Sequence, residues 1–403
     1  MSRLHPRLGR LWPLLKRLHR LATLLSGIVI RASRYGGARA VPTHGSRTAA
    51  DAVATEPDHV RVHVGHPAET VTREVARGGP APMAFFADQT SFEFPARFVL
   101  DVTDGRLVGD YGAVITPDGM LEAETSHYFG MASWREHPLY LSPRLPEERR
   151  VEGTVLSLVS HGTARNFYHL ITDLAPRWGI AREALPGLEP DHILVNTTWP
   201  IHHELFALLG LDRYDLINAT PETNLRADRV LVPGLYGFSG LGPPWVTTWL
   251  REHLPAREVA GRPKRLYVTR GERRNTRSLV HEREVVAALE KNGFTYFQPT
   301  EWTLQEQIDH FAAAEVVVGA HGAALTNLTF CPPGVRVLEM FAPTYLNPAY
   351  WAITTNIPDA RYRYLVGDPA EPDRPASKMR GLMQDVRVTP DEVLTAVEDL
   401  LGA

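Results

Sequence analysis

A run of valines that ends in a Gly-Ala-His-Gly turn constrains the fold of this chain more than any other feature. The run, Val316 to Val318, has the continuous β-branched pattern of a strand buried on both faces of a parallel sheet. Ligands of open α/β sheets bind outside the carboxyl ends of such strands, and glycines followed by a helix start offer free N–H groups to an anion. We therefore expect a ligand site built from Gly319, His321, Gly322, Ala323, Thr326 and Asn327.

Two of these residues have a second interpretation. His321 could be a hydrogen-bonded core histidine, although its position between glycines at a strand end favours contact with a phosphate or a sugar hydroxyl. Asn327 could cap the helix rather than bind a ligand.

Alternating strand and helix patterns predict two α/β domains. The chain has 403 residues, which exceeds a single compact core. Apolar runs bounded by turn residues indicate strands, and apolar residues at helical spacing indicate helices, one of them with Thr303 as N-cap and Glu306 at the capping-box position. We expect strands at 155–159, 192–195, 229–232, 266–269, 294–297, 315–318 and 335–340, and helices at 166–184, 200–209, 283–291, 303–313, 348–355 and 390–401.

Changes in composition give the expected boundaries. Residues 1–60 are predicted as a basic, partly apolar tail and linker, and 61–240 as a first domain that opens with a β-rich meander containing strands at 97–102 and 113–116. Residues 241–403 are predicted as a second domain with a final helix. The expected fold class is α/β, with two Rossmann-like domains facing across a cleft, a usual place for a ligand.

Charge is distributed unevenly along the chain. Residues 1–50 hold ten Arg or Lys and no acid, and the remainder holds 33 basic against 46 acidic residues. The apolar run 21–30 is shorter than the ~20 residues that span a bilayer. No small-residue cleavage site follows it, so peripheral contact of residues 1–35 with an anionic membrane surface fits better than a signal peptide. A disordered basic tail is the alternative.

The remaining composition limits the partners and the compartment. An acidic body disfavours nucleic acid as a partner. The only cysteine, Cys331, excludes an intramolecular disulfide and favours a reducing compartment. We therefore expect a cytoplasmic protein, peripheral on the inner face of the cell membrane; nothing in the sequence predicts an oligomeric state.

Four arginines follow the expected strand at 266–269 within eight residues. Most charge runs are solvated loops, but this run begins at the carboxyl end of a buried strand, and guanidinium groups match phosphate oxygens in bidentate fashion. Arg270 and Arg277 flank the loop, so we expect these two, rather than Arg273 and Arg274, to bind phosphate.

A carboxylate ends the next apolar strand, where Glu339 follows Val337 and Leu338. Burying a carboxylate is costly unless it is paired. Its expected partners are ribose hydroxyls or an arginine of the 270–277 loop, and a structural ion pair is the alternative.

A second polar cluster lies in the first domain, on the helix expected at 166–184. His169 and Asp173 are four residues apart and share a helix face, with Asn166 one turn earlier. Apolar neighbours weaken the interpretation as a surface His–Asp pair. A general base acting on an acceptor hydroxyl would suit this position, and either Asp173 or His169 could serve.

Several motifs are absent from the sequence. Neither a Walker A sequence nor Gly-x-Gly-x-x-Gly occurs, which disfavours P-loop and dinucleotide-binding proteins. Asp-x-Asp is also missing, as is any Cys/His cluster with zinc spacing. A diphosphate would then be neutralised by arginine, histidine and helix N-termini, without a metal ion.

Taken together, these segments resemble glycosyltransferase family 61, which includes many capsular-polysaccharide enzymes. The resemblance covers roughly residues 95 to 370. One departure is His281, which stands where asparagine is common before Glu282. The segments that carry the resemblance are Phe98 to Ser126, the Asn166/His169/Asp173 cluster, Tyr267 to Glu282, Glu306 to Ile308, Gly319 to Asn327 and Glu339.

The resemblance implies a GT-B architecture and an inverting, metal-independent transfer from a nucleotide sugar to a glycan acceptor. It implies an acceptor-side domain at 61–240 and a nucleotide-sugar-binding domain at 241–403, with no cofactor besides the donor. Arg270, Arg277 and His321 would hold the diphosphate, and Asn327 and Glu339 the nucleoside. The alternatives are an inactive nucleotide-sugar- or polysaccharide-binding component of an assembly complex and, last, a phosphate-ester hydrolase, for which neither a nucleophile nor a metal motif is present.

Overall fold

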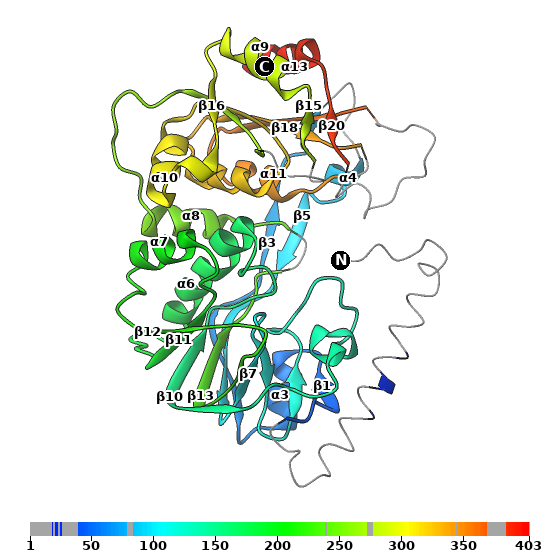
Figure 1. The fold of residues 1–403 in the computed structure, drawn as a ribbon, viewed down its shortest axis with the longest axis vertical. Coiled ribbons are helices and arrows are strands. Elements are labelled where there is room, and N and C mark those ends of the chain that lie inside the picture. The colour runs from blue at the N-terminus through cyan, green and yellow to red at the C-terminus, as the bar shows by residue number, and fades with distance from the viewer. Residues whose placement is uncertain are drawn as a thin grey trace. The chain divides into compact units, whose positions relative to one another are not determined.

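The computed structural model describes residues 39–78, 84–237, 240–271, 277–343, 345–368 and 384–402, together with Leu18, Leu21, Ala22 and Leu25. These residues form two compact units (Figure 1). Unit 1 holds the described residues up to Pro67, Ala96–Phe206 and Gly210–Leu235. Unit 2 holds the described residues of Ala68–Pro95, Ala207–Leu209 and Tyr236–Ala403. Arg273 and Arg274 lie outside the described residues.

Unit 1 contains one large mixed sheet. Its parallel part has the order β13-β10-β11-β12, in which β10 and β13 are neighbours although two strands separate them along the chain. The long strand β13 also pairs antiparallel with β7 and β6, so the meander predicted from the sequence continues the same sheet. The strands are β1 (His44–Ser46), β2 (Val60–His66), β6 (Arg97–Thr103), β7 (Arg106–Val108), β8 (Ala113–Ile115), β9 (Met120–Glu122), β10 (Arg149–Ser157), β11 (His192–Val195), β12 (Asp215–Asn218) and β13 (Asn224–Pro233).

The helices of unit 1 connect and cover this sheet. The helix predicted at 166–184 is present but is interrupted by one π-helical turn, an irregularity that is frequent at functional sites. The helices are α3 (Ala49–Thr55), α5 (Phe167–His169), the π-helix η3 (Leu170–Leu174), α6 (Ala175–Ala184) and α7 (Pro200–Leu208), and the short 3-10 helices are η1 (Trp134–Glu136) and η2 (Pro138–Leu141).

The predicted linker within residues 1–60 is wrong in its last part. Strand β1, helix α3 and the start of β2 all lie there, and Ala49 and Ala52 pack into the core. Helix α3 forms because Thr48 and Asp51 make a capping box, with Thr48 accepting a bond from the backbone N–H of Asp51. The box uses aspartate rather than the usual glutamate, which makes it a weaker signal in the sequence.

Unit 2 is built on a parallel sheet with the order β16-β14-β17-β18-β19-β4. When β14, β16, β17, β18 and β19 are numbered 1 to 5 in chain order, their order across the sheet is 2-1-3-4-5, which is a doubly wound order. Helices α9 and α13 lie on one side of the sheet, and α8, α10 and α11 lie on the other (Figure 1). The strands of the sheet are β4 (Arg77–Gly78), β14 (Arg265–Val268), β16 (Thr295–Phe297), β17 (Val316–Ala320), β18 (Arg336–Phe341) and β19 (Arg361–Val366).

The other elements of unit 2 include two small sheets. Strands β3 and β5 pair antiparallel, and β15 pairs parallel with β20. Strands β3–β5 come from residues 68–95, which the sequence placed in the first domain. These elements are β3 (Glu69–Thr72), α4 (Ala84–Ala87), β5 (Ser91–Phe94), α8 (Pro244–His253), β15 (Leu279–Val280), α9 (Glu282–Glu290), η4 (Pro299–Glu301), α10 (Leu304–Ala313), η5 (Ala323–Phe330), α11 (Ala349–Thr355), β20 (Val386–Arg387) and α13 (Pro390–Gly402).

The helix expected after the valine strand is a 3-10 helix, η5, and not an α-helix. The capping box of α10 is present as predicted, with Thr303 as N-cap and Glu306 bonding back to it. All five residues of β17 are buried, as the valine run indicated.

Candidate functional site

The phosphate-binding residues predicted from the sequence meet at one edge of unit 2. Strands β14 and β17 are neighbours, and the chain leaves them toward opposite sides of the sheet, which makes the gap between their carboxyl ends a topological switch point. Ligands of doubly wound sheets bind at such a point. Arg270 follows β14 by two residues and His321 follows β17 directly, so both emerge there.

His321 is held in place by a buried carboxylate. Its Nδ1 lies 2.5 Å from Glu339 Oε1, and Tyr362 Oη donates to the other oxygen, Oε2, at 2.5 Å. Glu339 is fully buried. Its hydrogen-bond partners are a histidine and a tyrosine, and not an arginine of the 270–277 loop as the sequence suggested. Burial lowers the pKa of His321 below its usual range despite the opposing charge of Glu339. A neutral His321 that donates through Nδ1 leaves its Nε2 lone pair free.

Both arginines predicted from the sequence lower the pKa of His321. Burial is the main cause of its lowered pKa, and the charges of Arg277 and Arg270 contribute further. Arg270 donates to the backbone carbonyl of His321, and a Cβ at Gly322 would collide with the Arg270 guanidinium. Arg277 lies over the Tyr345 ring at 4.7 Å. Its Nε is buried and has no hydrogen-bond partner among the described residues.

The turn between β14 and the arginine loop has its own support. Glu282 accepts bonds from Tyr267 Oη at 2.8 Å and from Thr269 Oγ1 at 2.7 Å. Thr269 Oγ1 in turn accepts from the backbone N–H of Gly271 at 3.0 Å. Glu282 therefore fixes the backbone from which Arg270 projects.

Position 281 has a conformational explanation. His281 is the N-cap of α9 and adopts a left-handed conformation, with φ of 61°. Asparagine and histidine are among the residues that tolerate this region best. The histidine here and the asparagine expected from the sequence resemblance both suit this backbone conformation.

The remaining predicted residues of this turn are largely internal. Thr326 and Asn327 are fully buried, and they bond to the Ala323 carbonyl at 2.7 Å and to Gln307 Oε1 at 2.9 Å. The Asn327 bond joins η5 to α10, whereas the Thr326 bond lies within η5. Asn327 Oδ1 is buried and has no hydrogen-bond partner among the described residues. At Gly319, a Cβ would come within 3.0 Å of the β14 backbone. Direct contact of these residues with a ligand stays a prediction.

Unit 1 has a switch point of the same kind. Strand β10 lies between β11 and β13, and the chain leaves it toward β11. The buried side chain of Arg177 joins the two carboxyl ends there, because it donates to the carbonyls of Val159 and Pro233. Helix α5 and the π-helix, which carry His169 and Asp173, follow β10.

His169 and Asp173 form a buried pair at this point. His169 Nδ1 lies 2.7 Å from Asp173 Oδ2, and the side chains are 15% and 9% exposed. Asp173 also accepts from Ser160 Oγ at 3.3 Å and Thr172 Oγ1 at 3.2 Å. Burial alone would raise the pKa of Asp173, but the charge and hydrogen bond of His169 outweigh burial and hold that pKa below its usual range. An ionised Asp173 orients His169 and leaves its Nε2 to accept a proton.

Asn166 does not share the face of this pair. It is the N-cap of α5, where its side chain accepts from the backbone N–H of Tyr168 at 2.9 Å. The sequence placed it one turn before His169, but the helix begins after it.

A second histidine, not predicted from the sequence, lies beside the pair. The rings of His161 and His169 are 5.1 Å apart, and the exposed ring of Phe129 lies 4.0 Å from that of His161. A Cβ at Gly162 would collide with His169, so glycine there permits this packing. Burial lowers the pKa of His161 to about 4. Among the described residues, His161, His169 and Asp173 are a group that could hold a metal ion.

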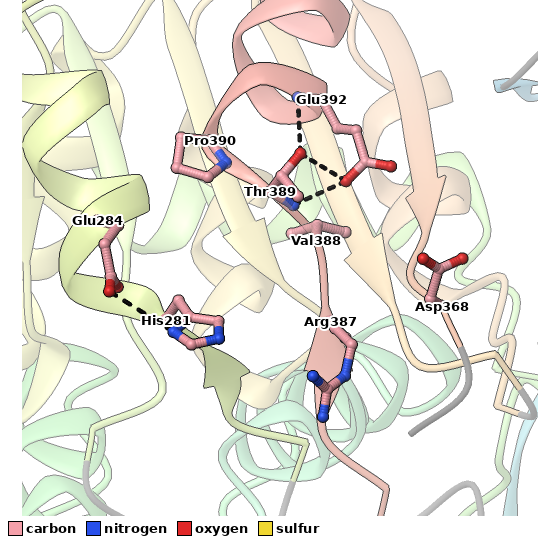
Figure 2. Close-up of a pocket in the computed structure, with 8 residues that line it drawn as sticks. All are labelled: His281, Glu284, Asp368, Arg387, Val388, Thr389, Pro390 and Glu392. Carbon is pink, nitrogen blue, oxygen red and sulfur yellow. Dashed lines mark hydrogen bonds and ion pairs between the residues drawn. The ribbon is translucent and has the colours of Figure 1, made fainter. Parts of the chain in front are cut away.

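A separate pocket of about 310 Å³ lies in unit 2 beside α9 and α13 (Figure 2). His281 and Glu284 line one side, and Thr389 and Glu392 cap the start of α13. None of the lining residues was predicted as a site residue. The pocket is lined by His281, Glu284, Asp368, Arg387, Val388, Thr389, Pro390 and Glu392.

Sequence reasoning missed residues whose signal depends on distant pairing. His161 is an exception, because it has a local sequence signal. It is a histidine next to a glycine after an apolar strand, which is the same pattern that led to the prediction of His321. Arg177, Tyr345 and Tyr362 have no such signal.

Unit 2 thus carries two arginines and a histidine at the switch point of its sheet, and unit 1 carries a histidine–carboxylate pair. Residues 167–338 match the family model of glycosyltransferase 61, a segment that runs from α5 to β18. The chain is therefore a glycosyltransferase. Such an enzyme uses a nucleotide-sugar donor and a glycan acceptor.

Two further comparisons add no argument. No curated protein sequence matches this chain. A solved structure, the bacterial iron-containing dodecameric glycosyltransferase TibC from enterotoxigenic E. coli H10407, is similar at 12% identity and covers 83% of this chain and 99% of its own. Its TM-score is 0.33, too low to support a statement on fold or function.

Proposed function

We propose that this glycosyltransferase moves a sugar from a nucleotide-diphosphate sugar to a glycan hydroxyl, with inversion and without a metal ion, in the synthesis of a surface or capsular polysaccharide. The observation that carries the proposal is the meeting of His321, Arg270 and Arg277 at the switch point of unit 2. The two-domain GT-B arrangement and the role of unit 1 as the acceptor side are parts of the same proposal.

The donor diphosphate binds at the β14–β17 switch point. Arg270 and Arg277 supply guanidinium groups, and His321 supplies an imidazole whose orientation is set by Glu339. Because the two guanidinium groups are in place before the reaction, they stabilise the charge that develops on the departing diphosphate, the kind of effect that usually contributes most to catalysis. Glu339 acts through His321, and Asn327 and Thr326 support the turn.

The acceptor hydroxyl loses its proton to His169. The bond from Nδ1 to Asp173 fixes the tautomer in which Nε2 is unprotonated. As the hydroxyl oxygen attacks the anomeric carbon, the proton moves to Nε2 and the bond to the diphosphate breaks. Asp173 then stabilises the imidazolium. The exposed ring of Phe129, packed edge-on against His161, offers an apolar face on which an acceptor sugar can stack.

The proposal places the enzyme in the cytoplasm, on the inner face of the membrane. Leu18, Leu21 and Leu25 are helical, more than half exposed and spaced so that they share one helix face. Ten basic residues and no acid accompany them in the first 50 positions, as expected for contact with anionic lipid. Among the described residues, none of the helices has the length and apolar character to cross a membrane. Flotation with anionic vesicles, with and without residues 1–35, tests this contact.

The function itself is tested with a panel of nucleotide sugars. Thermal-shift measurements identify the bound donor, and slow release of free nucleotide without an acceptor shows catalysis. Binding without any release, with or without candidate glycans, would contradict the proposal and support the inactive binding component instead. Release that is lost in Arg270→Ala but kept in Arg265→Ala, a variant of an arginine at the start of β14, would support it.

A further inference from the structure

The cluster of His161, His169 and Asp173 has the composition of a metal site. Each residue offers one ligand atom, and these atoms lie within 4.8 Å of one another. Two imidazoles and one carboxylate suit Zn²⁺, Co²⁺ or Fe²⁺, whereas Mg²⁺ and Ca²⁺ prefer oxygen ligands alone. The cluster lies at the carboxyl end of β10 and is backed by the fixed side chain of Arg177.

A second observation concerns His161 itself. Its Nδ1 is buried, yet it has no hydrogen-bond partner among the described residues. A buried polar atom without a partner is costly, and most such atoms in proteins are paired. His161 packs against His169 and Phe129, and the glycine at 162 lets its neighbour His169 approach the backbone. The ring is therefore held beside the His169–Asp173 pair, and its Nδ1 has no hydrogen-bond partner among the described residues.

The charges of the cluster fit one added cation. Asp173 is the carboxylate of the group, and both imidazoles can bind a metal ion only when neutral. Arg177 is a buried cation whose charge acts on His161 and Asp173, and its nitrogens donate to the carbonyls of Val159 and Pro233. Its charge lowers the attraction for a metal ion, so the site should exchange its ion reversibly rather than hold it permanently.

We propose that His161, His169 and Asp173 bind one divalent ion of the zinc class and that this ion inhibits the enzyme. The inhibitory part rests on the proposed function. An ion on Nε2 of His169 occupies the lone pair that would accept the acceptor proton. An ion on Nδ1 replaces the proton that fixes the tautomer. In both cases the base is lost, so His169 and Asp173 serve as a catalytic pair without metal and, together with His161, as an inhibitory site with it.

Metal binding is tested first on the full chain, stripped with chelator, without substrates. Co²⁺ is titrated and followed by its visible absorption, and Zn²⁺ is measured by competition. We expect one Co²⁺ per chain. Affinity should fall more than about 100-fold in His161→Ala, because loss of a ligand exceeds the 10- to 100-fold loss typical of outer-shell partners. His161→Asn, a polar replacement, serves if the alanine variant fails to fold by circular dichroism.

Two matched controls separate this site from other histidines. His192→Gln alters a His–Asp pair with a bond of 2.6 Å to Asp215 but no third ligand, and His127→Ala alters a histidine whose ring lies 6.2 Å from that of His161. Both variants should keep the Co²⁺ site. Equal Co²⁺ affinity in His161→Ala and the unmodified chain, or no stoichiometric binding at all, would overturn the proposal.

Inhibition is measured second, with each variant's rate without metal as its own reference. Zn²⁺ should inhibit nucleotide release by the unmodified enzyme, and His161→Ala should need a much higher Zn²⁺ concentration for the same fractional loss. Metal binding without inhibition would remove the regulatory role and keep the site. Loss of activity in chelator, restored by Zn²⁺, would instead make the ion catalytic and overturn the inhibitory role. A protein that binds Co²⁺ but releases no nucleotide would contradict the proposed function alone.

Discussion

Replacing Asp173 by asparagine tests which group removes the acceptor proton. The change keeps the shape of the side chain but removes the charge that lies 2.7 Å from His169 Nδ1 in a buried pair. A hydrogen bond to a charged group contributes about 1.5–3 kcal/mol. At about 1.36 kcal/mol per tenfold in rate, loss of this bond should lower kcat by about 10- to 160-fold.

Removal of the base itself should cost more. General base catalysis contributes about 10²- to 10⁴-fold, so His169→Gln should fall below Asp173→Asn. Because Asp173 acts through His169, the double variant should be no slower than His169→Gln alone. The assay is the initial rate of nucleotide release with the donor and acceptor that the panels select, and donor affinity by calorimetry should not change. Asp215→Asn, in a similar His–Asp pair at the amino ends of β11 and β12, is the control and should keep the full rate.

Two outcomes would refute this reasoning. If Asp173→Asn is slower than His169→Gln, the carboxylate itself takes the proton. The second outcome is a fold-decrease in kcat for the double variant that equals the product of the fold-decreases of the two single variants. The residues would then act independently, and the hydrogen bond between them would not be part of catalysis.

Three further predictions concern the donor site. Arg270→Ala and Arg277→Ala should each weaken nucleotide-sugar binding by about 10- to 160-fold in calorimetry, the value of one charge-assisted contact, and unchanged affinity in both would remove their phosphate role. Because the pKa of His321 is lowered in the free protein and a diphosphate favours the charged imidazole, binding should take up a proton. Affinity should then rise as pH falls from 8 to 6, and His321→Gln should abolish that slope; a persistent slope would assign the proton elsewhere. Gly322→Ala should displace the Arg270 guanidinium and weaken binding, whereas Gly242→Ala, where a Cβ meets open space, should leave titrations unchanged; equal affinities would show that Arg270 is free to move.

The parallel strands could be predicted because their signal is local. Runs such as Val316 to Val318 are apolar on both faces, and only a doubly covered strand accommodates that pattern. The assignment of residues 68–95 to unit 2 could not be predicted in the same way. Strand β4 pairs with β19, nearly 300 positions away, and no residue in either strand specifies the other. Strand β13 pairs with β10 of the parallel strands and with β6 of the meander. This pairing could not be predicted for the same reason, because the partners lie far away along the chain.

The candidate sites divide along the same line. Arg270, His321 and the His169–Asp173 pair could be predicted because each follows an apolar strand or has a partner one helical turn away. The partners of Glu339 could not, because they depend on sheet register and on the fold of the following turn. Glu339 pairs with Gly319 of β17 on one side and with Tyr364 of β19 on the other. This register brings His321 and Tyr362 within hydrogen-bond reach of Glu339.

His321, Glu339 and Tyr362 form a buried, hydrogen-bonded triad across neighbouring strands. Glu339 is fully buried and both of its oxygens already have hydrogen-bond partners, so it is not exposed to a ribose hydroxyl. The charge of Glu339 raises the pKa of His321. It thereby opposes the burial and the two arginine charges, which lower that pKa. If a diphosphate binds there, as proposed, and neutralises those arginines, the same carboxylate would favour the charged imidazole. The carboxylate at the end of the apolar strand is therefore paired with His321 and Tyr362 inside unit 2, and ligand contact by His321 stays a prediction.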